Sequence, residues 1–259
     1  MNSSSNRQSV AAFFDVDGTL VALPSLERRM FRELLYRSAI PAGNFVLWMA
    51  EAMRLATRGL ALARQGNKMY LRGVSVEVAG AVAERVAGAR HLRFFPEAVE
   101  RVAWHAAQHH RIFLVSGTLE LLARRAARSL EAALGQRGVA TEILVCATRL
   151  EEVRGRWTGR VGAEPMFGRA KAKTIAALAQ RMGWDLGTCF AYGDSVHDQA
   201  MLECVGHAMA VNPSPAMRRA AVREGWGAVE WREAEAAVGD PCGARTRARL
   251  PERNLENFR

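Results

Sequence analysis

The sequence predicts an α/β fold: a doubly wound parallel sheet, with a smaller helical domain inserted after its first strand. A short apolar run over 10–14 stops at an acidic residue, as a buried parallel strand does at its carboxyl end. Beyond residue 90, strand-like and helix-like segments alternate, which is typical of a parallel sheet with crossover helices. The 259 residues, 49% of them hydrophobic, provide for one substantial core with a smaller inserted module.

The segment 23–90 is predicted to be this inserted helical cap. Its apolar residues recur every four positions in two ladders, Leu26, Met30 and Leu34 in the first and Val74, Val78, Val82 and Val86 in the second. No strand pattern interrupts the segment. The core would then comprise 10–22 and 91–233.

The remaining core elements follow from changes in periodicity and from turn residues. We expect helices at 96–109, 119–134, 169–182 and 196–203, strands at 111–115, 142–147, 188–192 and 207–211, and a hairpin or loop at 149–161. A histidine cluster before the second strand is interpreted as a surface feature: His105, His109 and His110. Residues 1–9 form an expected disordered leader, and 234–259, which lose apolar periodicity, an expected loosely ordered tail.

The charge and composition of the chain exclude some classes of protein function. The net charge is +10, but the arginines are spread between acidic residues, so we expect a solvated surface and no nucleic-acid partner. The four cysteines form no Cys-x-x-Cys pair and the leader has no apolar signal segment, which favours a reducing, cytoplasmic location. Charged side chains interrupt the apolar stretch 45–63, which excludes a transmembrane span and leaves open a peripheral membrane contact.

Three predicted strands end in polar motifs suited to phosphate chemistry. They are Asp15-Val16-Asp17-Gly18-Thr19, Ser116-Gly117-Thr118 and Gly193-Asp194-Ser195-Val196-His197-Asp198. Because ligands of open parallel sheets bind outside the carboxyl ends of the strands, we expect the motifs to form one site. Ser116 and the amides after it are expected at a helix start, where an anion is favoured.

Phosphoryl transfer needs a nucleophile, an acid/base and a cation, and the motifs supply candidates for each. Asp15 comes first at its strand end and could attack phosphorus, while Asp17 could protonate the leaving oxygen and then activate water. Asp15 and Asp194 offer hard oxygen ligands that suit Mg²⁺, and Asp198 could hold a water bound to the metal.

Lysines are rare in this chain, which otherwise uses arginine for positive charge. Lys171 and Lys173 lie at the head of a predicted helix, and Lys171 is the preferred phosphate ligand, because a compact ammonium differs from a planar guanidinium. In the cap, Lys68 and Arg72 could face an anionic substrate, with a solvated helix end as the competing interpretation.

The ordered motifs resemble those of the haloacid dehalogenase (HAD) superfamily: Asp-x-Asp-Gly-Thr, a strand-end Ser-Gly-Thr, a helix-borne lysine and Gly-Asp-Ser-x-x-Asp. The cap lies between the first and second motifs, which further resembles the phosphoserine-phosphatase-like branch, subfamily IB. The resemblance covers 10–231. It implies a Rossmann-like core, a Mg²⁺ cofactor and a small phosphorylated substrate.

The resemblance also implies roles, position by position. Asp15 would be the nucleophile, Asp17 the acid/base whose backbone carbonyl also binds the metal, Ser116, Gly117 and Lys171 the phosphate ligands, Asp194 a Mg²⁺ ligand and Asp198 a residue that supports the metal ligands. Two positions depart from the family pattern. Pro24 stands where phosphoserine phosphatases usually have an acidic residue for the substrate ammonium, which disfavours phosphoserine. His197 stands where relatives often have Asn, and it has no assigned role.

The expected function is that of a Mg²⁺-dependent phosphatase that hydrolyses a small phosphomonoester through an aspartyl-phosphate intermediate. Two alternatives use the same residues and stay open: a phosphatase of lipid-linked phosphates, and a phosphotransferase that passes the phosphoryl group to an alcohol. A non-catalytic binding module is less favoured, because such a module has no need for both Asp15 and Asp17.

Overall fold

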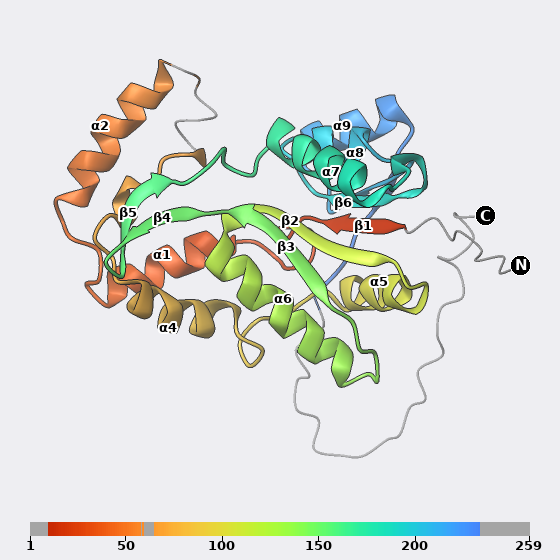
Figure 1. The fold of residues 1–259 in the computed structure, drawn as a ribbon, viewed down its shortest axis with the longest axis horizontal. Coiled ribbons are helices and arrows are strands. Elements are labelled where there is room, and N and C mark those ends of the chain that lie inside the picture. The colour runs from red at the N-terminus through yellow and green to blue at the C-terminus, as the bar shows by residue number, and fades with distance from the viewer. Residues whose placement is uncertain (1–9, 58, 60–64, 234–259) are drawn as a thin grey trace, which may run out of the picture.

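The computed structural model describes residues 10–57, 59 and 65–233 (Figure 1). The leader expected at 1–9, the tail expected at 234–259 and part of the stretch 45–63 lie outside the described residues. The strands are β1 (Ala11–Phe14), β2 (Arg111–Leu119), β3 (Ile143–Thr148), β4 (Leu150–Val153), β5 (Arg156–Val161), β6 (Phe190–Gly193), β7 (His207–Val211) and β8 (Gly227–Val229). The helices are α1 (Leu26–Tyr36), α2 (Asn44–Ala56), α4 (Val76–Ala87), α5 (Pro96–Ala107), α6 (Glu120–Gly135), α7 (Arg169–Met182), α8 (Gln199–Glu203) and α9 (Pro215–Glu224), with 3₁₀ turns η1 (Met69–Leu71) and η2 (Leu186–Thr188).

The main sheet is parallel and has the strand order β3-β2-β1-β6-β7-β8. Figure 1 shows α7, α8 and α9 on one side of it and α5 and α6 on the other. The doubly wound α/β fold predicted from the alternation of elements is therefore confirmed. The strand order reverses beside β1, between β1 and β6, and such a switch point opens a crevice at the carboxyl ends of the strands.

Strand β1 is fixed by packing on both of its faces. Ala12 and Phe14 belong to the core cluster on the α5 and α6 side, where Phe14 stacks on Tyr192 with ring centroids 4.4 Å apart. Ala11 and Phe13 belong to the opposite cluster, on the side of α7 to α9. Because successive side chains of a strand point to opposite faces, this short apolar run anchors the strand between two helical layers. The residue after it therefore has a well-defined position.

The segment after β1 is helical, as expected, and Leu26, Met30 and Leu34 form the buried face of α1. Its buried side chains form one continuous cluster with those of α5 and α6. The division into a core of 10–22 and 91–233 and a cap of 23–90 therefore remains a proposal.

The hairpin β4–β5, expected as a hairpin or loop, packs against the helical segment. The N–H of Gly73 donates to the carbonyl of Trp157 (2.8 Å), and the N–H of Trp157 donates to that of Val74 (3.0 Å). These hydrogen bonds join two segments that are about 80 positions apart in the sequence.

Two local predictions about strand and helix limits were wrong. Strand β2 continues to Leu119 and α6 begins at Glu120, so Ser116 lies within a strand and not at a helix start. The pairing of β2 with β3 shifts register between Ser116 and Leu119, and this irregularity lets the strand extend past the motif. In addition, α9 and β8 complete the sheet edge in a region where the sequence suggested no element.

Two predictions about burial were also wrong. Val78 is 38% exposed, because α4 buries a face of small residues that includes Ala79 and Ala83 in place of a complete valine ladder. His105, interpreted as a surface residue, is fully buried between the sheet and α5. Its ring nitrogens lie 2.8 Å from Nδ1 of His110 and 2.9 Å from the hydroxyl of Tyr192, so hydrogen bonding compensates for the burial.

Helix α2 exposes large apolar side chains at its surface: Phe45, Val46, Leu47, Met49 and Met53. It is nevertheless too short to be a membrane span. Within the ranges given above, no helix is long and apolar enough to cross a bilayer.

Candidate active site

The carboxylates of the first and last motifs meet at the ends of two neighbouring strands. Asp15 follows β1 and Asp194 follows β6, and these strands pair side by side. Both residues line a cavity of about 240 Å³, together with Asp17, Ser116, Gly117, Thr118, Lys171 and Asp198. The structure therefore gathers in one place the residues that the sequence proposed as nucleophile, acid/base, phosphate ligands and metal ligands.

Lys171 lies between two carboxylates in this cavity. Its Nζ donates to Oδ1 of Asp15 (2.6 Å) and to Oδ1 of Asp198 (2.5 Å), and all three residues are buried. Burial alone would lower the pKa of the Lys171 ammonium, but the two carboxylates raise it on balance. The lysine therefore stays charged, and it can hold Asp15 in position and attract a phosphate.

Asp15, Asp194 and Asp198 form an acidic cluster that fits a hard divalent cation. One carboxylate oxygen of each lies within 4.8 Å of the others. Burial raises the pKa of Asp15 to about 6 and that of Asp194 to about 8; the Asp198 carboxylate adds to both shifts and Lys171 opposes them. Such crowded carboxylates favour a cation of the Mg²⁺ type, which prefers oxygen ligands. Gly18 permits the crowding, because a β-carbon there would overlap the Asp194 carboxylate.

Asp17 is oriented by the start of α1. Its Oδ1 accepts a hydrogen bond from the backbone N–H of Leu26 (2.7 Å). Burial raises the pKa of Asp17 to about 7, and the negative charge of Asp15 adds to the shift. A carboxyl group that titrates near neutral pH can both donate and accept a proton, which suits acid/base chemistry.

The three residues of the second motif, Ser116, Gly117 and Thr118, all line the cavity. Oγ of Ser116 accepts from the backbone N–H of Thr118 (3.3 Å). Oγ1 of Thr118 is buried and has no hydrogen-bond partner among the described residues. An unpaired buried hydroxyl costs roughly 1–3 kcal/mol, and because other atoms of the protein cover this oxygen almost completely, it is not exposed to the cavity.

Glu27 and Phe167 also line the cavity, although the sequence analysis did not single them out. Glu27 lies in the first turn of α1, where an acidic residue is common because it complements the helix dipole, so its type gave no functional signal. Both of its carboxylate oxygens accept from Nζ of Lys68 (2.5 and 2.7 Å), and one also accepts from the hydroxyl of Tyr70. Phe167 precedes α7 and lies beside Gly117.

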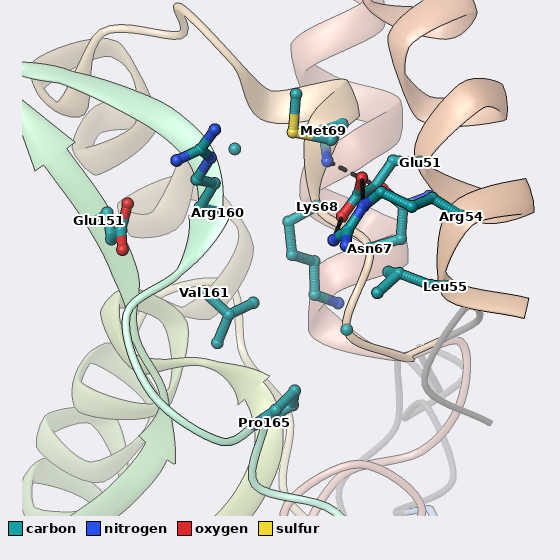
Figure 2. A pocket seen from close by; sticks show the side chains of 12 residues that line it. Glu51, Arg54, Leu55, Asn67, Lys68, Met69, Glu151, Arg160, Val161 and Pro165 are labelled. Carbon is teal, nitrogen blue, oxygen red and sulfur yellow. Dashed lines mark hydrogen bonds and ion pairs between the residues drawn. The ribbon is translucent and has the colours of Figure 1, made fainter. Parts of the chain in front are cut away.

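Lys68 and Arg72, proposed as substrate contacts from the cap, lie outside the cavity of Asp15. Lys68 is 4% exposed, and it reaches this cavity only through its ion pair with Glu27. Figure 2 shows it in a separate polar cavity of about 490 Å³, between helix α2 on one side and Glu151 and Arg160 of the hairpin on the other. Arg72 is exposed and lines another cavity beside the hairpin. Their contact with a substrate stays a prediction.

His197 connects the last motif to the helical segment. The side-chain nitrogen of Gln65 lies 2.8 and 3.0 Å from the two ring nitrogens of His197. The ring of Phe167 meets the His197 ring edge-on, with centroids 6.1 Å apart. Both rings line the cavity of Asp15, so His197 joins parts of its wall that are far apart in the sequence.

Comparisons with known sequences identify the family and relatives of this chain. The family model of haloacid dehalogenase-like hydrolases matches residues 12–203. A probable phosphatase of Mycobacterium tuberculosis is 31% identical over 232 residues, which cover 85% of this chain and 75% of the relative. A protein of the same species named as a phosphoserine phosphatase is 30% identical over 251 residues, which cover 89% of this chain and 73% of the relative.

Solved structures show the same fold. A Bordetella pertussis protein of unknown function has a TM-score of 0.64 and 27% identity, covering 86% of this chain and 98% of that one. A phosphoserine phosphatase solved with an analogue of a phospho-aspartyl intermediate has a TM-score of 0.55 and 18% identity, covering 82% of this chain and 91% of that one.

A doubly wound sheet whose switch point holds an acidic cluster and a buried lysine defines a hydrolase built for phosphoryl groups. The chain belongs to the family of haloacid dehalogenase-like hydrolases. Within it, the chain is a phosphatase of the phosphoserine-phosphatase-like branch, so the resemblance seen in the four motifs is confirmed.

Proposed function

We propose that the protein is a Mg²⁺-dependent phosphatase that hydrolyses a small phosphomonoester through a phosphoryl group carried on Asp15. The observation that carries the proposal is the position of Asp15: a buried carboxylate held by Lys171 at 2.6 Å, in a cavity that Asp17 and Asp194 also line. Asp15, Asp194 and the backbone carbonyl of Asp17 would hold the Mg²⁺. When bound, the ion would offset the negative charge of the phosphate.

In the first half-reaction a carboxylate oxygen of Asp15 attacks phosphorus. The new O–P bond forms while the bond from phosphorus to the ester oxygen breaks, and protonated Asp17 gives its proton to the leaving alcohol. Lys171 and the hydroxyl of Ser116 hold the phosphoryl oxygens in place. The raised pKa of Asp17, about 7, supports this role, because its protonated form is available near neutral pH.

In the second half-reaction water replaces the alcohol. The Asp17 carboxylate takes a proton from the water as its oxygen attacks phosphorus, the bond from phosphorus to Asp15 breaks, and inorganic phosphate leaves. Asp15 and Asp17 are thereby ready for the next cycle. A reducing, cytoplasmic location belongs to the proposal, and the free thiols of Cys146, Cys189 and Cys204 support it.

Phosphoserine, which appears in the name of a relative, is not the substrate we propose. Pro24 stands where an acidic residue for the substrate ammonium is expected. Glu27 does line the cavity, but its charge is already offset by Lys68. An ammonium group would therefore find no unpaired carboxylate on this side of the cavity among the described residues.

Phosphate release from a panel of phosphomonoesters with Mg²⁺, measured for the wild type beside Asp15→Asn, tests the proposal. We expect the wild type to hydrolyse at least one ester and Asp15→Asn to hydrolyse none, since the variant lacks the attacking oxygen. An Asp15→Asn protein as active as the wild type would rule out the proposed chemistry.

A second candidate function is the hydrolysis of a lipid-linked phosphate at a membrane surface. The apolar side chains that α2 exposes, among them Val46 (72%) and Met53 (67%), favour it. Flotation with anionic liposomes tests this candidate. Recovery of the wild type with the vesicles and loss of this recovery in Val46→Ser/Met53→Ser would support it, and a wild type that stays in the lower fraction would exclude it.

A further inference from the structure

A second cavity adjoins the one that holds Asp15. Its volume is about 480 Å³, and Ser25, Glu27 and Phe167 line both cavities. Helices α1 and α2, the turn η1 and the loop before α7 contribute its walls. A volume in this range is that of a binding pocket for a small organic molecule. The alcohol part of an ester bound at Asp15 thus has this cavity directly beside it.

Aromatic side chains are concentrated in the walls of the second cavity. The chain as a whole is 7% aromatic, but five of the 11 lining residues are aromatic: Phe31, Phe45, Trp48, Tyr70 and Phe167. None of the five is fully buried, so their rings are not simply part of the core. The Phe31 ring meets those of Phe45 and Tyr70 edge-on, at interplanar angles of 81° and 89°.

At the polar end of the second cavity the one carboxylate among the described lining residues, Glu27, is already paired, and the exposed Arg28 lines the cavity as well. Both oxygens of Glu27 accept from Lys68, and one also accepts from the hydroxyl of Tyr70. Burial raises the pKa of the Tyr70 hydroxyl, and the charge of Glu27 adds to the shift, so this hydroxyl keeps its proton. A cationic ligand would have to compete with Lys68 for the same carboxylate. The cavity therefore disfavours a cationic group, and its aromatic walls suit an apolar one.

We propose that this second cavity binds the alcohol part of the substrate, and that this part carries a neutral aromatic ring. The inference rests on the proposed phosphatase function and adds the substrate class. Rings already arranged edge-on can receive a further ring in offset-stacked or edge-to-face contact, which an alkyl chain cannot reproduce. Trp48, on α2, is the residue whose contact with that ring is most easily tested, because its side chain lies apart from the reacting carboxylates.

Three esters of primary alcohols separate the possibilities: ethyl phosphate, 2-phenylethyl phosphate and n-octyl phosphate. All three esters release a primary alcohol of similar intrinsic reactivity. Differences in kcat/KM therefore report on the contacts that the alcohol part makes with the protein. We expect 2-phenylethyl phosphate to exceed ethyl phosphate by about 10- to 100-fold, the effect of burying a phenyl group. It should exceed n-octyl phosphate, which has as many carbon atoms, by about two- to tenfold.

Trp48→Ala tests the cavity itself, and Phe45→Ala is a second variant about one turn away on the same face of α2. Each should lower kcat/KM for 2-phenylethyl phosphate by about tenfold while leaving that for ethyl phosphate unchanged. The matched control is Val46→Ala, on the same helix, 72% exposed and outside the cavity lining. It should leave the kcat/KM of both esters unchanged.

Other outcomes would overturn the inference in distinguishable ways. Equal kcat/KM for ethyl and 2-phenylethyl phosphate would overturn it and leave the phosphatase function standing. A preference for n-octyl phosphate would assign the cavity to alkyl chains instead. An equal loss on both esters in Trp48→Ala and Phe45→Ala would show that these residues act only through the fold. Release of phosphate from none of the three esters would count against the phosphatase function as well.

Discussion

The ring of Phe167 lies against the backbone of Gly117 so closely that a β-carbon at position 117 would overlap the ring. Gly117 stands between the two hydroxyl residues of the second motif, and Phe167 forms part of the wall shared by the two cavities. Gly117 does not have the positive φ that commonly requires a glycine. It is required because the Phe167 side chain, 50 positions further along the chain, leaves no room for a β-carbon. This contact links the phosphate site to the walls that surround the substrate.

Replacing Gly117 with alanine should displace the Phe167 ring and distort the phosphate site. We expect a loss of about 1–3 kcal/mol in the free energy of unfolding, as for other overpacked positions. On ethyl phosphate, kcat/KM should fall by about 10- to 100-fold, because small displacements of positioning groups have effects of this size. Denaturant unfolding and steady-state kinetics measure the two effects.

Two further variants show whether the effect of Gly117→Ala comes from overlap of the new β-carbon with the Phe167 ring or from any glycine-to-alanine change. Gly117→Ala/Phe167→Ala removes the ring that overlaps and should recover most of the lost kcat/KM on ethyl phosphate. Gly135→Ala, at the end of α6 where a β-carbon has open space, should leave stability and activity near those of the wild type. Unchanged kinetics in Gly117→Ala would refute the importance of this contact.

Replacing Asp194 with asparagine should weaken the metal site while leaving its shape unchanged. Asp194 follows β6 and contributes one oxygen to the acidic cluster with Asp15 and Asp198. Loss of one anionic ligand should raise the Mg²⁺ concentration for half-maximal activity by about 10- to 100-fold. Phosphate release titrated against Mg²⁺ measures this. Glu203→Gln, at an exposed position on α8, is the control, and the same titration midpoint in Asp194→Asn would place the metal elsewhere.

Much of the fold follows from local patterns in the sequence. The apolar run of β1, the β-strand at His207–Val211 and the helix at Arg169–Met182 each have a periodicity that belongs to one kind of element, and all three form as expected. Alternation of such elements then implies a parallel sheet, and a parallel sheet implies that residues after its strands converge. The sequence alone therefore predicts that Asp15 and Asp194 lie close together.

The parts that could not be predicted depend on contacts between distant segments. Glu27 pairs with Lys68 and Tyr70 more than 40 positions away, and Phe167 reaches Gly117 across 50. The periodicity of a local segment does not indicate which distant residues it contacts, so these pairs could not be predicted. His105 shows the same limit, since a polar residue type suggests exposure, while the hydroxyl of Tyr192 that makes its burial tolerable comes from strand β6, 87 positions away.

The buried His105 should make the stability of the protein fall at mildly acidic pH. Burial, together with the nearby His110 and Arg101, lowers its pKa to about 2. The unfolded chain binds a proton below about pH 6.5 that the folded protein does not accept, so stability rises with pH in this range. Between pH 7.5 and pH 5 this histidine alone should cost about 2 kcal/mol, with the loss continuing towards pH 2.

Comparison with His105→Gln isolates this effect from the other titrating groups. Glutamine can still bond to the hydroxyl of Tyr192 but takes up no proton, so its free energy of unfolding should fall less between pH 7.5 and pH 5 than that of the wild type. His91→Gln, at an exposed position, should follow the wild-type profile. Parallel pH profiles for His105→Gln and the wild type would show that His105 does not cause the loss.

Asp17 and Asp15 should be separable by their effects on a phosphoryl-enzyme. With a good leaving group such as p-nitrophenolate, Asp17→Asn should still transfer the phosphoryl group to Asp15, because no proton donor is needed in that step. Hydrolysis of the intermediate should slow by about 10²- to 10⁴-fold, since the base that activates water is absent. On alkyl phosphates the same variant should be nearly inactive, and burst-phase kinetics distinguish the two cases.

The most direct measurement of the central claim is peptide mass spectrometry of Asp17→Asn protein quenched during its reaction with p-nitrophenyl phosphate and Mg²⁺. Asp15→Asn/Asp17→Asn, treated in the same way, is the control. We predict one phosphoryl group on Asp15 in the single variant and none in the double variant. A phosphoryl group on Ser116, or one that persists in the double variant, would contradict the assignment of Asp15 as the nucleophile.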